Sequence, residues 1–131
     1  MLALKTVLSR ADRTPTLIFD EIDQGIGGRV GTVVGAKLWR LTQSSYPEVE
    51  GVGQPGHQVL CITHLPQLAA FGDVHYGVEK TVTDGRTIAL VRRLESRARL
   101  DELAQMLGTQ GAAALQGAED LLVQASNLKS G

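Results

Sequence analysis

Two short apolar segments constrain the fold of this 131-residue chain more than any other feature. The segment Thr16–Phe19 contains Thr-Leu-Ile-Phe, and Val59–Thr63 contains Val-Leu-Cys-Ile-Thr, so neither alternates polar and apolar residues. Such segments are typical of strands inside a sheet that is covered on both faces. Between them, apolar residues recur at helical spacing from Val30 to Leu41, which predicts a helix that ends near Gln43. Strand, helix and strand in this order predict a βαβ unit with two parallel strands.

Turn and helix signals elsewhere predict the remaining elements. The stretch 44–56 holds two prolines and three glycines, and we expect a flexible surface loop there. The other expected elements are a helix at 4–11, a short helix opened by Pro66, strands at 74–82 and 87–93 joined by a tight turn at Asp84-Gly85, and helices at 100–107 and 114–125. The predicted fold class is therefore α/β, with parallel strands covered by helices, an antiparallel hairpin and C-terminal helices.

Composition limits the class of protein. A hydrophobic content of 43% is enough for the core of one domain, and the formal charge of -1 gives no electrostatic footprint for nucleic acid over the whole chain. The single cysteine, Cys61, excludes an internal disulfide, and its apolar neighbours predict a buried, reduced thiol. No apolar stretch approaches the roughly 20 residues that cross a bilayer. We expect a cytoplasmic protein with no membrane partner.

Polar side chains follow both predicted strands at the point where each strand ends. Asp20 and Glu21 follow the first strand, and His64 follows the second. Ligands of parallel sheets bind beyond the carboxyl ends of the strands. Adjacent residues at a strand end point to opposite sides, so one carboxylate can face a metal ion while the other faces a water molecule. This combination suits phosphoryl transfer around Mg²⁺, although each signal alone is also common at ordinary strand ends.

The wider sequence around these residues resembles a known family. Residues 16–21 resemble the Walker B strand and catalytic glutamate of ABC-type ATPases, and Ile62-Thr63-His64 resembles their switch histidine. The strings at 19–28, 61–69 and 98–108 resemble the RecN family, whose ATPase heads are of the ABC/SMC type. The resemblance covers nearly the whole chain except residues 44–56, which look like an insertion relative to the RecN family. It implies that residues 1–131 form the C-terminal lobe of a P-loop NTPase-like head.

The resemblance also implies a role for each site residue. Asp20 would hold Mg²⁺, Glu21 would polarise the water that attacks the γ-phosphate of ATP, and His64 would contact that phosphate. The D-loop, which takes part in nucleotide binding and meets a partner head, would comprise Asp23, Gly25, Gly27 and Gly28. Many ABC proteins place an aspartate late in this loop, where this chain has Gly27.

Two nucleotide-binding motifs are absent from the sequence. It contains no Gly-x-x-x-x-Gly-Lys-Ser/Thr string to cradle phosphates and no Ser-Gly-Gly signature. The resemblance implies that both motifs lie outside this chain, so we expect the isolated chain to bind ATP weakly and to be inactive. The implied partners are the N-terminal Walker A lobe of the same protein, a second head in an ATP-dependent dimer, and DNA. The implied role is ATP-dependent DNA double-strand break repair and recombination, at the nucleoid.

Two other classes of function stay open at this point. In a metal-dependent nuclease or topoisomerase-like module, Asp20, Glu21 and Asp23 would bind catalytic Mg²⁺ directly, although such a site needs another acidic residue where this chain has His64. In a non-catalytic interaction domain with an ATPase-like fold, Glu21 would have no catalytic role.

Several other polar or aromatic residues have ordinary structural interpretations. Trp39 is expected to pack against the core, and His57 and His75 have no partner at metal-ligand spacing. A basic cluster is interpreted as a solvated hairpin end, with DNA contact as the alternative; it comprises Arg92, Arg93, Arg97 and Arg99.

Overall fold

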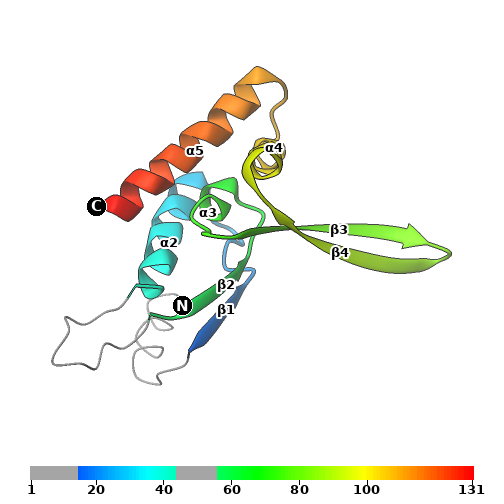
Figure 1. Cartoon of the computed structure of the whole chain (residues 1–131), viewed down its shortest axis with the longest axis horizontal. Coiled ribbons are helices and arrows are strands. Elements are labelled where there is room, and N and C mark those ends of the chain that lie inside the picture. Colours follow the sequence, from blue (N-terminus) through cyan, green and yellow to red (C-terminus); the bar gives the residue numbers. More distant parts are fainter. Residues whose placement is uncertain (1–14, 44–55) are drawn as a thin grey trace.

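The computed structural model describes residues 15–43 and 56–131, which fold into helices and strands in the order shown in Figure 1. The elements are β1 (Thr16–Asp20), α2 (Gly28–Leu41), β2 (Gln58–Ile62), α3 (Pro66–Ala69), β3 (His75–Thr83), β4 (Arg86–Leu94), α4 (Ser96–Met106) and α5 (Ala112–Ser130). The helix expected at 4–11 lies outside the described residues, and so does the expected loop apart from Gly56.

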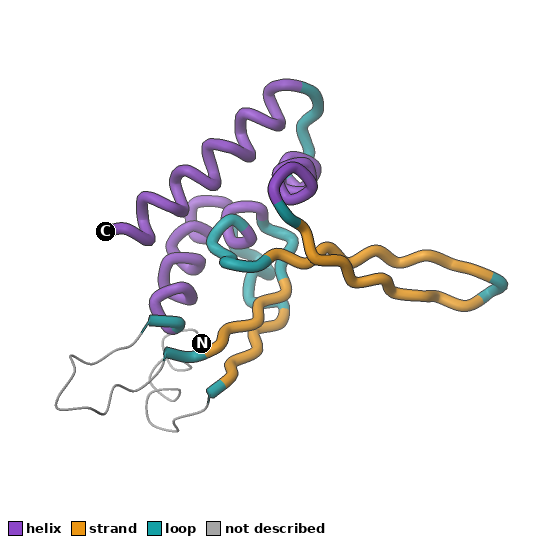
Figure 2. Tube along the Cα trace, viewed as in Figure 1, coloured by secondary structure: helices purple, strands orange, loops and turns teal. Residues whose placement is uncertain are grey.

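The predicted βαβ unit is present. Strands β1 and β2 pair in parallel, with Thr16 opposite Gln58 at one end and Asp20 opposite Ile62 at the other. Helix α2 forms the connection between them, and the two strands lie side by side in Figure 2. Because the strands are parallel and in register, their carboxyl ends lie at the same edge of the sheet.

Helices cover one face of this two-stranded sheet, so the prediction of strands covered on both faces is wrong for the described chain. Phe19 is buried against a cluster formed with Leu38, Leu41 and Leu68. On the other face, the side chain of Ile18 is 64% exposed and that of Ile62 is 60% exposed. The helices α2 and α3 pack on the Phe19 side, and no described element covers the opposite side.

Helix α2 and the segment after α3 approach each other closely. A Cβ atom at Gly35 would lie 2.4 Å from Cδ2 of Phe71, which is itself buried. Only glycine therefore fits at this position without moving the aromatic ring. Trp39, one turn further along α2, packs with Leu121 and Leu122 of α5 against the buried cluster around Phe71. The packing interpretation of Trp39 is confirmed.

The predicted hairpin is also present, and it extends away from the helices in Figure 1. Strands β3 and β4 pair antiparallel, and the two turn residues Asp84 and Gly85 have positive φ angles of 51° and 74°. This is the geometry that a two-residue turn requires, and it matches the twist of the strands.

Helices α4 and α5 form the C-terminal part of the fold. Gly108 follows the end of α4 with a φ of 71°, the left-handed conformation in which glycine commonly ends a helix. The two helices pack through a buried cluster that includes Leu103 and Ala118. Among the described residues, no helix is long and apolar enough to span a membrane.

Candidate functional site

The predicted site residues from the two strands lie at one edge of the sheet. Asp20 is the last residue of β1 and is opposite Ile62, the last residue of β2. Glu21 follows Asp20 directly, and His64 lies two residues beyond Ile62. The structure therefore brings the carboxylate pair and the imidazole to the same end of the two strands. All three of these side chains are exposed, as an accessible ligand site requires.

Glu21 has an unusual backbone conformation. Its φ angle is +55°, in the left-handed region that residues with a Cβ rarely adopt. The Gln24 backbone N–H donates to the Glu21 carbonyl oxygen at 3.4 Å, in the turn that follows the strand. Residues in such regions cost about 1–3 kcal/mol each and cluster at functional sites. The conformation is consistent with a functional constraint on Glu21.

Asp23 lies beneath this edge and contacts the segment that carries His64. Its side chain is 2% exposed, and its Oδ2 atom lies 3.1 Å from Nδ1 of His64. The same oxygen accepts a hydrogen bond from the His64 backbone N–H at 2.9 Å and another from the Thr63 hydroxyl. These contacts join the loop after β1 to the loop after β2.

The Asp23 carboxyl group remains ionised in this environment. Burial by itself raises its pKa, but the hydrogen bonds from Thr63 and His64 outweigh burial, and the pKa lies below its ordinary value. Asp23 is therefore a buried anion at neutral pH, and its hydrogen-bond donors come from residues 40 and 41 positions further along the chain.

The glycines of the predicted D-loop have two different settings. Gly25 has a φ of 74°, and a Cβ at Gly25 or Gly27 would meet nothing within 4 Å. Gly27 directly precedes the first residue of α2. A Cβ at Gly28, in contrast, would lie 2.8 Å from Nε2 of Gln67, so this glycine allows α2 to approach α3. Gly25 and Gly27 thus leave an open surface beside the site.

Cys61, in strand β2, is not a nucleophile in this setting. Its pKa is raised to about 11, first by burial and then by the negative charges of Asp23 and Asp20. The side chain is partly buried, and the thiol is protonated at neutral pH. The sequence predicted a buried, reduced thiol; in the structure Cys61 is a free cysteine that is only partly buried.

Asp20 has the chemistry of a magnesium ligand. It presents an exposed carboxylate, a hard oxygen donor, at the end of β1. In nucleotide sites, Mg²⁺ is bound by one or two carboxylates together with phosphates and water. No group of three His, Cys, Asp or Glu side chains among residues 15–43 and 56–131 could hold a metal ion. The Asp23 carboxylate, which the nuclease alternative needs as a third ligand, is 2% exposed and accepts hydrogen bonds from Thr63 and His64, so it does not join Asp20 and Glu21 at the surface.

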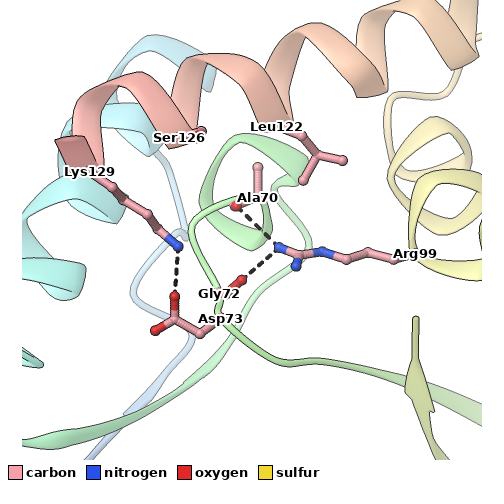
Figure 3. A pocket seen from close by; sticks show the side chains of 7 residues that line it. All are labelled: Ala70, Gly72, Asp73, Arg99, Leu122, Ser126 and Lys129. Atoms are coloured by element: carbon pink, nitrogen blue, oxygen red, sulfur yellow. Dashed lines mark hydrogen bonds and ion pairs between the residues drawn. The ribbon is translucent and has the colours of Figure 1, made fainter. Parts of the chain in front are cut away.

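The four arginines of the basic cluster are already engaged within the chain. Arg92 pairs with Glu79 at 3.0 Å, and the pairs of Arg93 with Glu95 and Arg97 with Asp101 lie at 3.0 Å and 2.9 Å. Arg99 donates to the carbonyl oxygens of Ala70 and Gly72 at 3.2 Å and 2.7 Å, in the pocket shown in Figure 3. Arg99 therefore has a structural role, whereas the side chains of Arg92, Arg93 and Arg97 are 70%, 59% and 71% exposed, and such surface pairs do not decide between the two interpretations.

Thr63 belongs to the site, although the sequence pattern gave it no role of its own. Its hydroxyl group donates to Asp23 and accepts a hydrogen bond from the Leu65 backbone N–H at 3.0 Å. The only local signal was its place directly before His64. A hydroxyl residue at the end of a buried strand is too common to be singled out from one sequence.

Comparisons with known proteins identify the relatives of the chain. No family model matches it. Over 123 residues, or 93% of its length, it is 46% identical to the DNA repair protein RecN of Deinococcus radiodurans. It is 44% identical over 107 residues to RecN of Xylella fastidiosa, which covers 82% of the chain. The chain belongs to the RecN family. The RecN protein of Bacillus subtilis matches 99% of the chain at 35% identity.

This RecN-family chain spans about a fifth of the length of its curated relatives, with 17% of the Xylella protein, 19% of the Deinococcus protein and 21% of the Bacillus protein. The fold has a solved counterpart from a study of the ATP-driven dimerization and DNA-stimulated activation of SMC ATPases. That structure matches with a TM-score of 0.61 at 20% identity, covering 84% of this chain and 58% of the other. The likeness shows that the chain shares its fold with part of that SMC ATPase structure.

Proposed function

We propose that this chain supplies the hydrolytic residues of a RecN-like ATPase head that acts in DNA repair. The observation that carries the proposal is the parallel register of β1 and β2, which brings Asp20, Glu21 and His64 to one edge of the sheet. The curated relatives are DNA repair proteins named RecN, and the fold resembles an SMC ATPase. These relationships support ATP hydrolysis coupled to DNA repair. Within DNA repair, the proposal assigns the chain to double-strand break repair and recombination, as the family resemblance implies.

Each residue then has one chemical task. The Glu21 carboxylate orients and polarises a water molecule for attack on the γ-phosphate of ATP. The His64 imidazole donates a hydrogen bond to that phosphate, and Asp20 holds Mg²⁺ directly or through a water molecule. The ion, when bound, neutralises charge on the phosphate oxygens. Catalysis of this kind consists mostly of positioning and electrostatic stabilisation, which three fixed polar groups can provide.

The open surface at Gly25 and Gly27 supports a contact with a second head. A backbone without side chains can approach another molecule closely, and nothing lies within 4 Å of a Cβ built at either glycine. We assign this surface to a head–head interface formed in the presence of ATP. The Walker A lobe of the same protein would supply the phosphate cradle that this sequence lacks.

A non-catalytic interaction domain is the alternative that remains. Glu21 has a φ of +55°, but the exposed turn residue Asp84 has a φ of 51° without any catalytic role, so the backbone conformation does not decide between the two assignments. If Glu21 is catalytic, its substitution lowers the rate of ATP hydrolysis. If Glu21 has no catalytic role, the rate stays the same.

The isolated chain is expected to bind ATP weakly and not to hydrolyse it. A phosphate cradle of backbone N–H groups and a lysine provides much of the affinity of ATP sites, and this sequence has no such string. Isothermal titration calorimetry with Mg²⁺ and ATP should therefore give no saturable binding at micromolar nucleotide. A full-length RecN-family protein carrying this chain is the positive control. Stoichiometric, tight binding of ATP by the chain alone would contradict the proposal that the Walker A lobe supplies the phosphate-binding groups.

A further inference from the structure

One buried anion organises the segment that carries His64. A single oxygen of Asp23, Oδ2, accepts from the His64 backbone N–H at 2.9 Å and lies 3.1 Å from the His64 ring nitrogen Nδ1. It also accepts from the Thr63 hydroxyl, which in turn accepts from the Leu65 N–H at 3.0 Å. The same atom therefore anchors both the backbone and the ring of His64.

These contacts determine which edge of the imidazole ring is free. The ring nitrogens lie on different edges, so a ring whose Nδ1 faces Asp23 turns Nε2 away from it. The His64 side chain is 73% exposed, whereas that of Asp23 is 2% exposed. Most of the ring surface is therefore accessible on the edges that do not face Asp23, while the carboxylate stays beneath the surface. A contact at one ring nitrogen can orient the other nitrogen for its function.

The burial of Asp23 also bears on its place in the D-loop. The carboxylate carries its charge in the folded protein, and that charge is stabilised by Thr63 and His64. With 2% of its side chain exposed and its Oδ2 atom already surrounded by donors, Asp23 is poorly placed to contact a nucleotide or a second head directly. Its contacts lie within its own chain, on the switch segment 63–65.

We propose that Asp23 is a positioning residue, which holds the His64 ring so that Nε2 meets the terminal phosphate. This inference rests on the proposed function of His64 and adds to it a partner that the family resemblance placed among the nucleotide-binding residues. A free surface histidine samples several rotamers, and ordering it during each turnover would slow the reaction. A His64 ring that Asp23 already holds before ATP binds avoids this ordering step.

A double-mutant cycle between Asp23 and His64 tests the proposal in a full-length RecN-family protein carrying this chain. Asp23→Asn keeps the size of the side chain and an acceptor for the His64 N–H but removes the charge. We expect it to lower kcat about 10- to 100-fold with little change in KM for ATP. In the His64→Ala background, the same substitution should lower kcat less than about twofold, because the ring that it positions is absent.

The possible outcomes separate this inference from the function on which it rests. An equal loss of kcat from Asp23→Asn in both backgrounds would overturn the positioning role. A raised KM in both backgrounds would also overturn it, and would indicate direct nucleotide contact. If His64→Ala itself left kcat unchanged, the proposed role of His64 would fail and the inference with it. If His64→Ala lowered kcat while Asp23→Asn did not, the inference alone would be wrong.

A milder pair of variants covers the case in which Asp23→Asn does not fold. Thr63→Val removes the hydroxyl donor to Asp23 and keeps the shape of the side chain, whereas Thr63→Ser keeps the hydroxyl. We expect kcat to fall severalfold in the valine variant and to return to about the wild-type value in the serine variant. Equal rates for valine and serine, with both proteins folded by thermal melting, would argue against an anchored His64.

Discussion

In a full-length RecN-family protein carrying this chain, Glu21→Gln lowers kcat for ATP hydrolysis by about 100-fold or more, while ATP binding persists. Glutamine has the size of glutamate but cannot accept a proton or carry the negative charge that polarises the attacking water. General-base contributions of this kind amount to roughly 10²–10⁴-fold in rate. Steady-state hydrolysis measured over a range of ATP concentrations gives kcat and KM separately.

Nucleotide that is bound but not hydrolysed should accumulate between the heads in this variant. Light scattering should therefore detect an ATP-dependent dimer that persists longer than in the wild type. Glu119→Gln is the matched control, because Glu119 is an exposed glutamate on α5, away from the sheet edge. A Glu21→Gln variant that hydrolyses ATP at the wild-type rate would favour the non-catalytic alternative.

The second large effect is expected from His64→Ala, which should lower kcat by about 100-fold. Removing one preorganised donor to a transition-state oxygen costs about 10²–10³-fold in kcat. The variant leaves the Asp23 carboxylate with the Thr63 hydroxyl and a backbone N–H as donors. The fold should therefore survive, which a thermal melt of the variant can verify.

A second histidine, which flanks the other end of the same strand, provides a matched control for this prediction. His57 directly precedes β2, at the end of the strand opposite to His64, so His57→Ala should keep kcat within about twofold. Similar rates for His64→Ala and the wild type would remove the imidazole from the proposed mechanism. Equal losses in the two histidine variants would indicate that the change acts through stability.

The parts of the fold that local signals determine were predictable from the sequence. The apolar runs before Asp20 and His64 correctly predicted two parallel strands, and Asp84-Gly85 correctly predicted the hairpin. In each case a few consecutive residues favour one local structure through their backbone preferences and their polarity. The place of Asp20, Glu21 and His64 at the strand ends followed from the same signals.

What depends on contacts between distant segments was not predictable. The apolar character of Ile18 and Ile62 suggested that both faces of the sheet are covered, but coverage depends on which other elements are present. The bond between Asp23 and the segment at Thr63 joins residues 40 positions apart. Neither residue carries a local sequence signal for this pairing, and the family resemblance implied only a place for Asp23 in the D-loop.

The most direct measurement is a structure of a full-length RecN-family protein carrying this chain, with Mg²⁺ and a non-hydrolysable ATP analogue bound. A γ-phosphate oxygen should lie within hydrogen-bond distance of His64 Nε2, about 3 Å. Asp20 should face the ion, and Glu21 should face the water in line with the γ-phosphate. A bound nucleotide whose terminal phosphate lies away from all three side chains would show that they do not form the hydrolytic site.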